Sequence, residues 1–297
     1  MPTWDEILKE IGSANSIIDV TRRKYIKELS ELTGRNTIVY YSGWLQKPVL
    51  AQQGIDFSIN DNDKNGFMAV VNKLDKTKGL DLVLHTPGGN VASTESIVNY
   101  LKSIFGNDIR AIVPQIAMSA GTMIACACKS IVMGKQSNLG PIDPQFGIYP
   151  AHGILEEFER AKRDILENPG SIIVWREILK KYNPTLIGEC EKAIKWSETM
   201  VSEWLKNNMF SKDPDKETKV ADIIKFLGSH DTTLSHSRHI HMKELQEIGL
   251  AIEIMEKDQK LQDRILSVHH ATIISITQTQ SVKIIENNLG KAFIQSA

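Results

Sequence analysis

The chain has 297 residues, a formal net charge of −1 and 41% hydrophobic residues. This length fits one large domain with appendages or two small domains, because domains usually contain ~100–200 residues. The near-neutral charge excludes a generally basic surface of the kind that coats nucleic acid. Only three cysteines are present, too few for a disulfide framework, and this indicates a reducing compartment.

The start of the chain does not have the pattern of a signal peptide, and we expect none. The first residues, MPTWDEILKE, carry acids where a signal peptide carries basic residues. The longest apolar run, at 116–128, is shorter than the ~20 residues that a membrane span needs. We therefore expect a cytoplasmic protein without a membrane span.

Short apolar strands alternate with amphipathic helices through the first half of the chain. A charged helical segment at 3–33 comes first. Short apolar runs then predict strands at 37–44, 80–85, 109–114 and 130–134. Apolar residues at helical spacing predict helices at 93–105 and 119–128 between them. Such an alternation is typical of βαβ units, so we expect an α/β fold with a mainly parallel sheet.

The second half has a different character. Residues 151–180 and 184–210 are long, charged and amphipathic, and are predicted to be helical. The tail looks like a β-hairpin that turns at 287–290. We accordingly divide the chain into a helical segment (1–36), a core (37–257) with a helical insertion at about 151–228, and a hairpin tail (258–297).

Two glycines follow a proline in the stretch HTPGGNVASTESI, residues 85–97. Gly88 and Gly89 fall at the turn from a predicted strand to a predicted helix. Glycine at such a turn permits positive φ and lets another molecule approach the backbone closely. The turn could bind a phosphate, bind an oxyanion or only change the direction of the chain.

Ser119 occupies a similar position in the stretch IAMSAGTM, residues 116–123. A serine at the start of a helix is commonly just a cap, but the backbone N–H groups and dipole there also favour negative charge. Residue 117 is alanine, so the Gly-x-Ser-x-Gly hydrolase signature is absent. Because parallel strands end at one edge of a sheet, Ser119 and the glycine turn are predicted to face each other.

These motifs, with SNLGPIDPQ and the later HDTTL and LQEIGLAIEI, resemble the core of the Clp/crotonase superfamily. The chain is similar to serine proteases of the Clp and signal-peptide-peptidase A type, and most of all to the serine dehydrogenase proteinase (SDH) family. The resemblance implies a repeated ββα/βαβ core with additional helices. It also implies that Ser119 is the nucleophile, and that Gly88, Gly89 and the N–H of Ala120 form the oxyanion hole.

The resemblance offers two candidates for the catalytic base. Clp-type peptidases carry a histidine where this chain has Asp143, and an aspartate in the region that here reads Ser229-His230-Asp231. The resemblance therefore allows an exchange of roles, with His230 as base and Asp143 behind it, since triads are defined by geometry. Asp143 as a turn residue and His230 as a surface histidine remain alternatives.

Lysine is the rival base, because signal-peptide-peptidase relatives use a Ser–Lys dyad. Lys162 could serve if burial lowered its pKa, but its charged neighbours indicate a solvated helix face. His236, His239 and His241 crowd one segment without sharing a helix face, and are interpreted as solvated residues or, as an alternative, a metal site. No metal ligand set is predicted.

The leading hypothesis is a serine peptidase that needs no cofactor, acts on a peptide or protein, and assembles as a trimer-based homo-oligomer. A crotonase-like acyl-CoA hydrolase or hydratase could use the same oxyanion turn, although Ser119 would then have no purpose. A non-catalytic oligomeric scaffold is the third alternative. Serine dehydrogenation itself is not indicated, since no G-x-G-x-x-G turn follows a first strand and no cofactor lysine motif is present.

Overall fold

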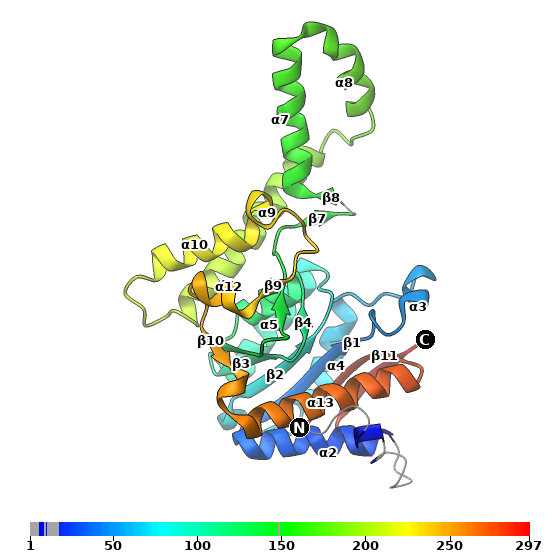
Figure 1. Cartoon of the computed structure of the whole chain (residues 1–297), viewed down its shortest axis with the longest axis vertical. Coiled ribbons are helices and arrows are strands. Elements are labelled where there is room, and N and C mark those ends of the chain that lie inside the picture. Colours follow the sequence, from blue (N-terminus) through cyan, green and yellow to red (C-terminus); the bar gives the residue numbers. More distant parts are fainter. Residues whose placement is uncertain (1–5, 9, 11–17, 148) are drawn as a thin grey trace.

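A seven-stranded sheet forms the centre of the molecule, with helices on both faces (Figure 1). The computed structural model describes residues 6–8, 10, 18–147 and 149–297. The strand order is β10-β5-β3-β2-β1-β11-β12, in which the first five strands pair in parallel and β11 pairs antiparallel with both β1 and β12. The strands are β1 (Asn36–Ser42), β2 (Leu80–His85), β3 (Ile109–Val113), β5 (Ser130–Met133), β10 (Ile252–Ile254), β11 (Ser281–Asn287) and β12 (Ala292–Ser296). The predicted α/β class with a mainly parallel sheet is confirmed.

Side chains that alternate along each strand feed two separate cores. In β2, Leu82 and Leu84 point into the larger core, whereas Val83 points into the smaller one on the opposite face. The larger core is covered by α4 (Asp61–Val71), α5 (Val91–Phe105), α6 (Ala120–Cys126), α9 (Leu186–Asn207) and α10 (Lys216–Gly228). The smaller core is covered by α2 (Ile18–Thr33) and α13 (Gln259–Gln278), which lie side by side in Figure 1.

Short elements occupy the loops that connect the long strands and helices. A second small sheet has the order β4-β6-β9 and connects the segment before Ser119 with two later loops. The short elements are β4 (Ile116–Ala117), β6 (Asn138–Leu139), β9 (Ile240–His241), β7 (Gln145–Phe146), β8 (Tyr149–Pro150), α3 (Pro48–Gln52), α11 (His230–Thr233), α12 (Met242–Glu247) and the 3-10 turns η1 (Lys76–Lys78), η2 (Pro169–Ser171) and η3 (Met255–Lys257).

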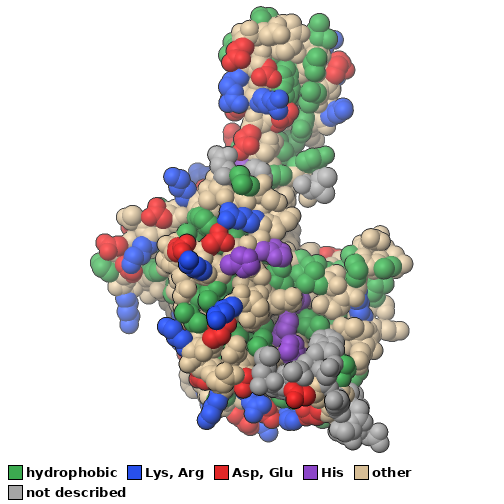
Figure 2. Space-filling view, in the orientation of Figure 1, with side chains coloured by type: hydrophobic (Ala, Val, Ile, Leu, Met, Phe, Trp, Pro, Cys, Tyr) green, Lys and Arg blue, Asp and Glu red, His purple; other side chains and the backbone are tan. Residues whose placement is uncertain are grey.

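An arm made of α7 (Ala151–Glu167) and α8 (Ile172–Leu179) projects from the body (Figure 1). A small core at its base joins α7 to α9 through Ile154, Phe158 and Cys190. Further out, large aliphatic side chains are exposed, among them Leu166 at 83% and Ile173 at 71%. Figure 2 shows hydrophobic side chains at the surface along this arm.

The tail differs from the prediction of a hairpin over 258–297. A hairpin is present as β11 and β12, but it is preceded by the 20-residue helix α13, which also contains His269 and His270. The stretch ATIISI has the β-branched composition of a strand, yet it is helical because almost all of its side chains are buried against the sheet and α2. Tertiary packing outweighs local propensity here. Of the predicted N-terminal segment, residues 1–5, 9 and 11–17 lie outside the described residues.

Candidate active site

Ser119 lies at the turn that joins β4 to α6, in a conformation unusual for serine. Its φ is 51° and its ψ is −116°, and among the described residues its side chain makes no capping hydrogen bond to α6. A positive φ in a residue with a Cβ stores strain, and such strain is concentrated at functional sites. Because the hydroxyl makes no such bond, Ser119 does not serve as a helix cap, the role that a serine commonly has at the start of a helix.

The glycine turn packs directly against Ser119. A Cβ on Gly88, whose φ is +96°, would lie 2.7 Å from the Cβ of Ser119 and 2.7 Å from the carbonyl oxygen of Met118. The two loops are also joined by backbone bonds, in which Met118 donates to Thr86 at 3.0 Å and Thr86 donates to Ile116 at 3.2 Å. The close approach predicted from the sequence is present, and only glycine fits it.

The N–H groups of Gly88 and Gly89 differ in their hydrogen bonding. The N–H of Gly88 donates to Oγ1 of Thr86 at 3.1 Å, so it is used inside the turn, contrary to the prediction that both glycines provide free donors. Gly89 forms a parallel bridge with Ile59, but the two bonds of that bridge use the Gly88 carbonyl and the Asn90 N–H, at 2.7 and 2.8 Å. The N–H of Gly89 is in neither bond.

Ala120 offers the second donor. It is the first residue of α6, and the N–H of a first helical residue has no acceptor within its own helix. A Cβ on Gly88 would lie 3.0 Å from this nitrogen, which measures how near the Ala120 amide is to the glycine turn. Gly89 and Ala120 are therefore the candidate oxyanion donors beside Ser119.

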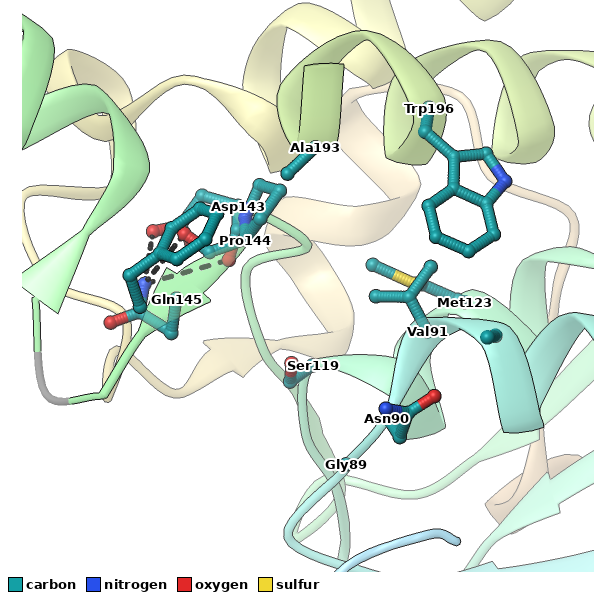
Figure 3. A pocket seen from close by; sticks show the side chains of 12 residues that line it. Gly89, Asn90, Val91, Ser119, Met123, Asp143, Pro144, Gln145, Ala193 and Trp196 are labelled. Carbon is teal, nitrogen blue, oxygen red and sulfur yellow. Dashed lines mark hydrogen bonds between the residues drawn. The ribbon is translucent and has the colours of Figure 1, made fainter. Parts of the chain in front are cut away.

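A cavity of about 360 Å³, here called the Trp196 pocket, opens over Ser119. Gly89 and Asn90 line it from the glycine turn, and Ala193 and Trp196 of α9 form its roof (Figure 3). Other lining side chains are apolar or come from the segment after β6, and include Val91, Met123, Asp143, Pro144 and Phe146. The helical insertion thus contributes directly to the wall around Ser119.

Asp143 is the buried acid of this pocket. Only 1% of it is exposed, and its two carboxylate oxygens have different partners. Oδ2 accepts from Nε2 of Gln145 at 2.8 Å, and Oδ1 lies 2.8 Å from Nδ1 of His236. A buried carboxylate that holds one nitrogen of a partly exposed imidazole fixes the ring and leaves its other nitrogen available.

Among the described side chains, the histidine beside Asp143 is His236, whereas the sequence predicts His230 for this role. His230 begins α11, but its side chain lies outside the described part of the structure. His236 follows in the loop between α11 and β9, in a stretch of sequence that favours a solvated histidine. The separation of 93 residues between His236 and Asp143 gives no local signal for their contact.

Lys162 does not meet the requirement of burial. Its side chain is 67% exposed on α7 and forms an ion pair with Glu159 at 2.5 Å, on the arm and away from the residues that line the Trp196 pocket. Burial is the condition under which Lys162 could serve as the base, and the structure does not meet it.

His85 also lies away from Ser119. It faces the smaller core, where its ring stacks on Tyr41 at a centroid distance of 5.3 Å. It also contacts the tilted ring of Trp44 at 4.6 Å and the edge-on ring of His269 at 5.5 Å. Its two ring nitrogens have no hydrogen-bond partner among the described residues. Burial lowers the pKa of His85 to about 3, so the ring is neutral.

A metal site and a membrane span find no support in the described part of the chain. Within it, no group of three or more His, Cys, Asp or Glu side chains is arranged to hold a metal ion. Of the helices that the structure describes, none combines the length and the apolar character needed to cross a bilayer.

Taken together, a parallel α/β sheet, a glycine turn at its carboxyl edge and a strained serine at the start of a helix define a ClpP-like fold with a candidate serine-hydrolase centre. A family model described as ClpP-like SDH-type serine proteinase matches residues 13–263. The chain belongs to this family.

Two relatives are uncharacterised proteins of Methanocaldococcus jannaschii. One is 31% identical over 237 residues, which covers 80% of this chain and 74% of the relative. The other is 34% identical over 173 residues, which covers 58% of this chain and about half, 51%, of the relative. Among solved structures, a mutant of the membrane-bound stomatin-specific protease 1510-N aligns with a TM-score of 0.42 and 14% identity, over 70% of this chain and 79% of that chain. That likeness is too loose to carry an argument about this protein.

Proposed function

We propose that the protein is a serine peptidase that hydrolyses peptide bonds through an acyl-enzyme on Ser119. The observation that carries the proposal is the pair formed by Asp143 and His236, because Asp143 lines the same pocket as Ser119. Membership in a serine proteinase family supports the same activity. In this proposal the general base is His236, in place of the His230 predicted from the sequence.

The pair sets up the imidazole as a general base. When Nδ1–H of His236 donates to Asp143, the lone pair is on Nε2, which is the arrangement that a triad requires. Oγ of Ser119 then attacks the carbonyl carbon while its proton passes to Nε2. The charge that develops on the carbonyl oxygen is stabilised by the N–H groups of Gly89 and Ala120.

The tetrahedral intermediate collapses by breaking the C–N bond, and His236 gives its proton to the leaving amine. A water molecule attacks the acyl-enzyme by the same route and releases the acid and free Ser119. No electron transfer takes place, and this chemistry calls for neither metal nor cofactor.

An active-serine probe tests the proposal. A fluorophosphonate is expected to label Ser119, with no label in Ser119→Ala and labelling on the order of 10³-fold slower in His236→Ala. His241→Ala is the matched control, since His241 is an exposed histidine of the same segment. It lines neither the Trp196 pocket nor the second cavity, which His236 lines. It should label at the rate of the unmodified protein.

Two outcomes would contradict the proposal. Labelling of a serine other than Ser119 would exclude Ser119 as the nucleophile. Unchanged labelling in His236→Ala, together with loss of labelling in His230→Ala or in Lys162→Ala, would show that His230 or Lys162, and not His236, is the base. Thermal unfolding of each variant shows whether a loss of labelling reflects a loss of fold.

A further inference from the structure

A second cavity, of about 450 Å³, is lined by residues of the same loops that form the candidate active site, among them Pro87, Met118 and His236. We call it the Trp44 pocket. Three neighbouring pairs divide between the cavities. Pro87 and Met118 line the Trp44 pocket, while the nearby Gly89 and Ser119 line the Trp196 pocket. In the third pair, His236 lines the Trp44 pocket and its partner Asp143 lines the Trp196 pocket.

The contact between Gly88 and Ser119 is therefore a boundary between two cavities. A substrate whose scissile bond lies at this boundary would have one part on each side. The position of the imidazole decides which cavity holds the acyl part of the substrate and which holds the leaving amine. The group that protonates the leaving amine must lie on the leaving-group side of the bond. His236 is on the Trp44 side.

We propose that the Trp44 pocket is the leaving-group subsite of the enzyme, and that it receives an aromatic or large aliphatic residue immediately after the cleaved bond. This inference rests on the proposed peptidase function. The acyl part of the substrate then lies in the Trp196 pocket.

The lining of the Trp44 pocket supports this choice of residue. The indole of Trp44 packs at a tilt against the buried ring of His85, with the ring centroids 4.6 Å apart. Leu45, Ile116 and Met118 add apolar surface. Among the described residues that line the pocket there is no Asp, Glu, Lys or Arg, and its titratable side chains are those of His236 and His239. A charged side chain would therefore lose its hydration without gaining a carboxylate, ammonium or guanidinium partner.

Polar groups in the same pocket suit the peptide backbone. The carboxamides of Gln115, Gln136 and Asn138 line it, and such groups both donate and accept hydrogen bonds. An extended segment could use them for its N–H and C=O groups while its first side chain rests on the indole of Trp44. An aromatic side chain has a face for this contact, and a leucine has enough apolar area for it.

Partition of the acyl-enzyme between water and added amines tests the subsite alone. An activated ester acylates Ser119, and phenylalaninamide, leucinamide, glycinamide or glutamic acid α-amide is then supplied as competing nucleophile. Phenylalaninamide and leucinamide should give an aminolysis-to-hydrolysis ratio on the order of 10-fold above that of glycinamide, since a well-filled apolar pocket discriminates by such factors. Glutamic acid α-amide should show no gain.

Trp44→Ala is expected to reduce the phenylalaninamide ratio to the glycinamide level. Trp196→Ala is the matched control, because it removes the same side chain from the other pocket. It should change the rate of acylation but leave the partition ratio as it was, since both products arise from the same acyl-enzyme. Leu45→Ala, a change at a side chain that is 48% exposed, tests the pocket without a risk to folding and should lower the ratio in part.

The outcomes separate the two claims. If Ser119 is acylated but all amines partition alike, or if Trp196→Ala rather than Trp44→Ala changes the ratio, the subsite assignment is wrong and the peptidase proposal stands. If the ester does not acylate Ser119 at all, both are overturned.

Discussion

His85 makes folding stability depend on pH at the scale of a single residue. Its ring is buried between Tyr41, Trp44 and His269, and burial lowers the pKa of His269 as well as that of His85. The folded protein therefore does not accept a proton at His85 until the pH is far below 6.5. The unfolded chain does so near pH 6.5, so stability is present above this pH and is lost as the pH falls.

We predict that the free energy of unfolding falls by about 2 kcal/mol between pH 7 and pH 5 because of His85, for a group that titrates near 6.5 only in the unfolded chain. Urea unfolding at the two pH values measures the change. His85→Phe removes the titrating group and keeps the ring stacking, so it should lose this part of the pH dependence. Equal pH dependence in the two proteins would contradict the assignment.

How much of the site could be predicted depends on how local each contact is. The strand, glycine turn and helix around Gly88 are contiguous in the chain, and so is the turn that carries Ser119. The rule that parallel strands end at one edge then brings them together. His236 could not be found in this way, because its position depends on how the chain returns after the 151–228 insertion. The internal bond from Gly88 to Thr86 was hidden too, because it depends on a threonine rotamer.

At the scale of elements, β11 braces the glycine turn from a distance. Lys283 of β11 is fully buried, and its ammonium donates to the Ser58 carbonyl at 2.5 Å and to both oxygens of Asp63 at 2.9 and 3.0 Å. Ser58 precedes Ile59, which bonds the turn at Gly88 and Asn90. A strand that pairs antiparallel with β1 thus fixes the backbone beside Ser119.

We predict that Lys283→Met slows fluorophosphonate labelling of Ser119 by about 10-fold or more in protein that is still folded, since loss of one oxyanion donor costs about 10²–10³ and a misaligned one costs less. Arg22→Met is the control. It breaks another buried ion pair on β11, to Glu286 at 2.6 Å, and this pair does not reach the glycine turn. Equal labelling in the two variants at temperatures well below unfolding would show that β11 contributes stability only.

Whether a segment is a helix or a strand was predictable where its length and its apolar pattern agree. The strands β2 and β3 are short apolar runs and agree with their predicted ranges to within a residue. The helix α13 was missed because it is buried on nearly all sides, so its apolar residues show neither helical nor strand periodicity. Only the space between the sheet and α2 decides its structure.

At the scale of the whole molecule, the arm leaves apolar surface uncovered by the described chain. The side chains of Leu166, Ile172, Ile173 and Val174 are 52–83% exposed within a short segment (Figure 2). Concentrated apolar surface of this kind is typical of interfaces. The sequence predicted the helices of the arm but not its projection from the body, which depends on the small core at its base.

We predict a homo-oligomer in which the arm contacts a second copy of the chain. Light scattering should give a multiple of 33.3 kDa, with a trimer as the unit, and Ile173→Asp should reduce the mass toward that of one chain. Val20→Asp changes a comparably exposed side chain, at 53%, on the body and should leave the mass unaltered. A mass of one chain for the unmodified protein would contradict the prediction.

The bracing of the glycine turn by Lys283 has a consequence for biosynthesis. A ribosome makes the chain from its N-terminus, so Ser119 and both glycines leave the exit tunnel long before residue 283 is translated. Until β11 has paired with β1, the Ser58 carbonyl and Asp63 lack their ammonium partner. The growing polypeptide is thus expected to be at least about 10-fold less active than the finished chain, and full activity should appear only when nearly all of the described chain has emerged and folded.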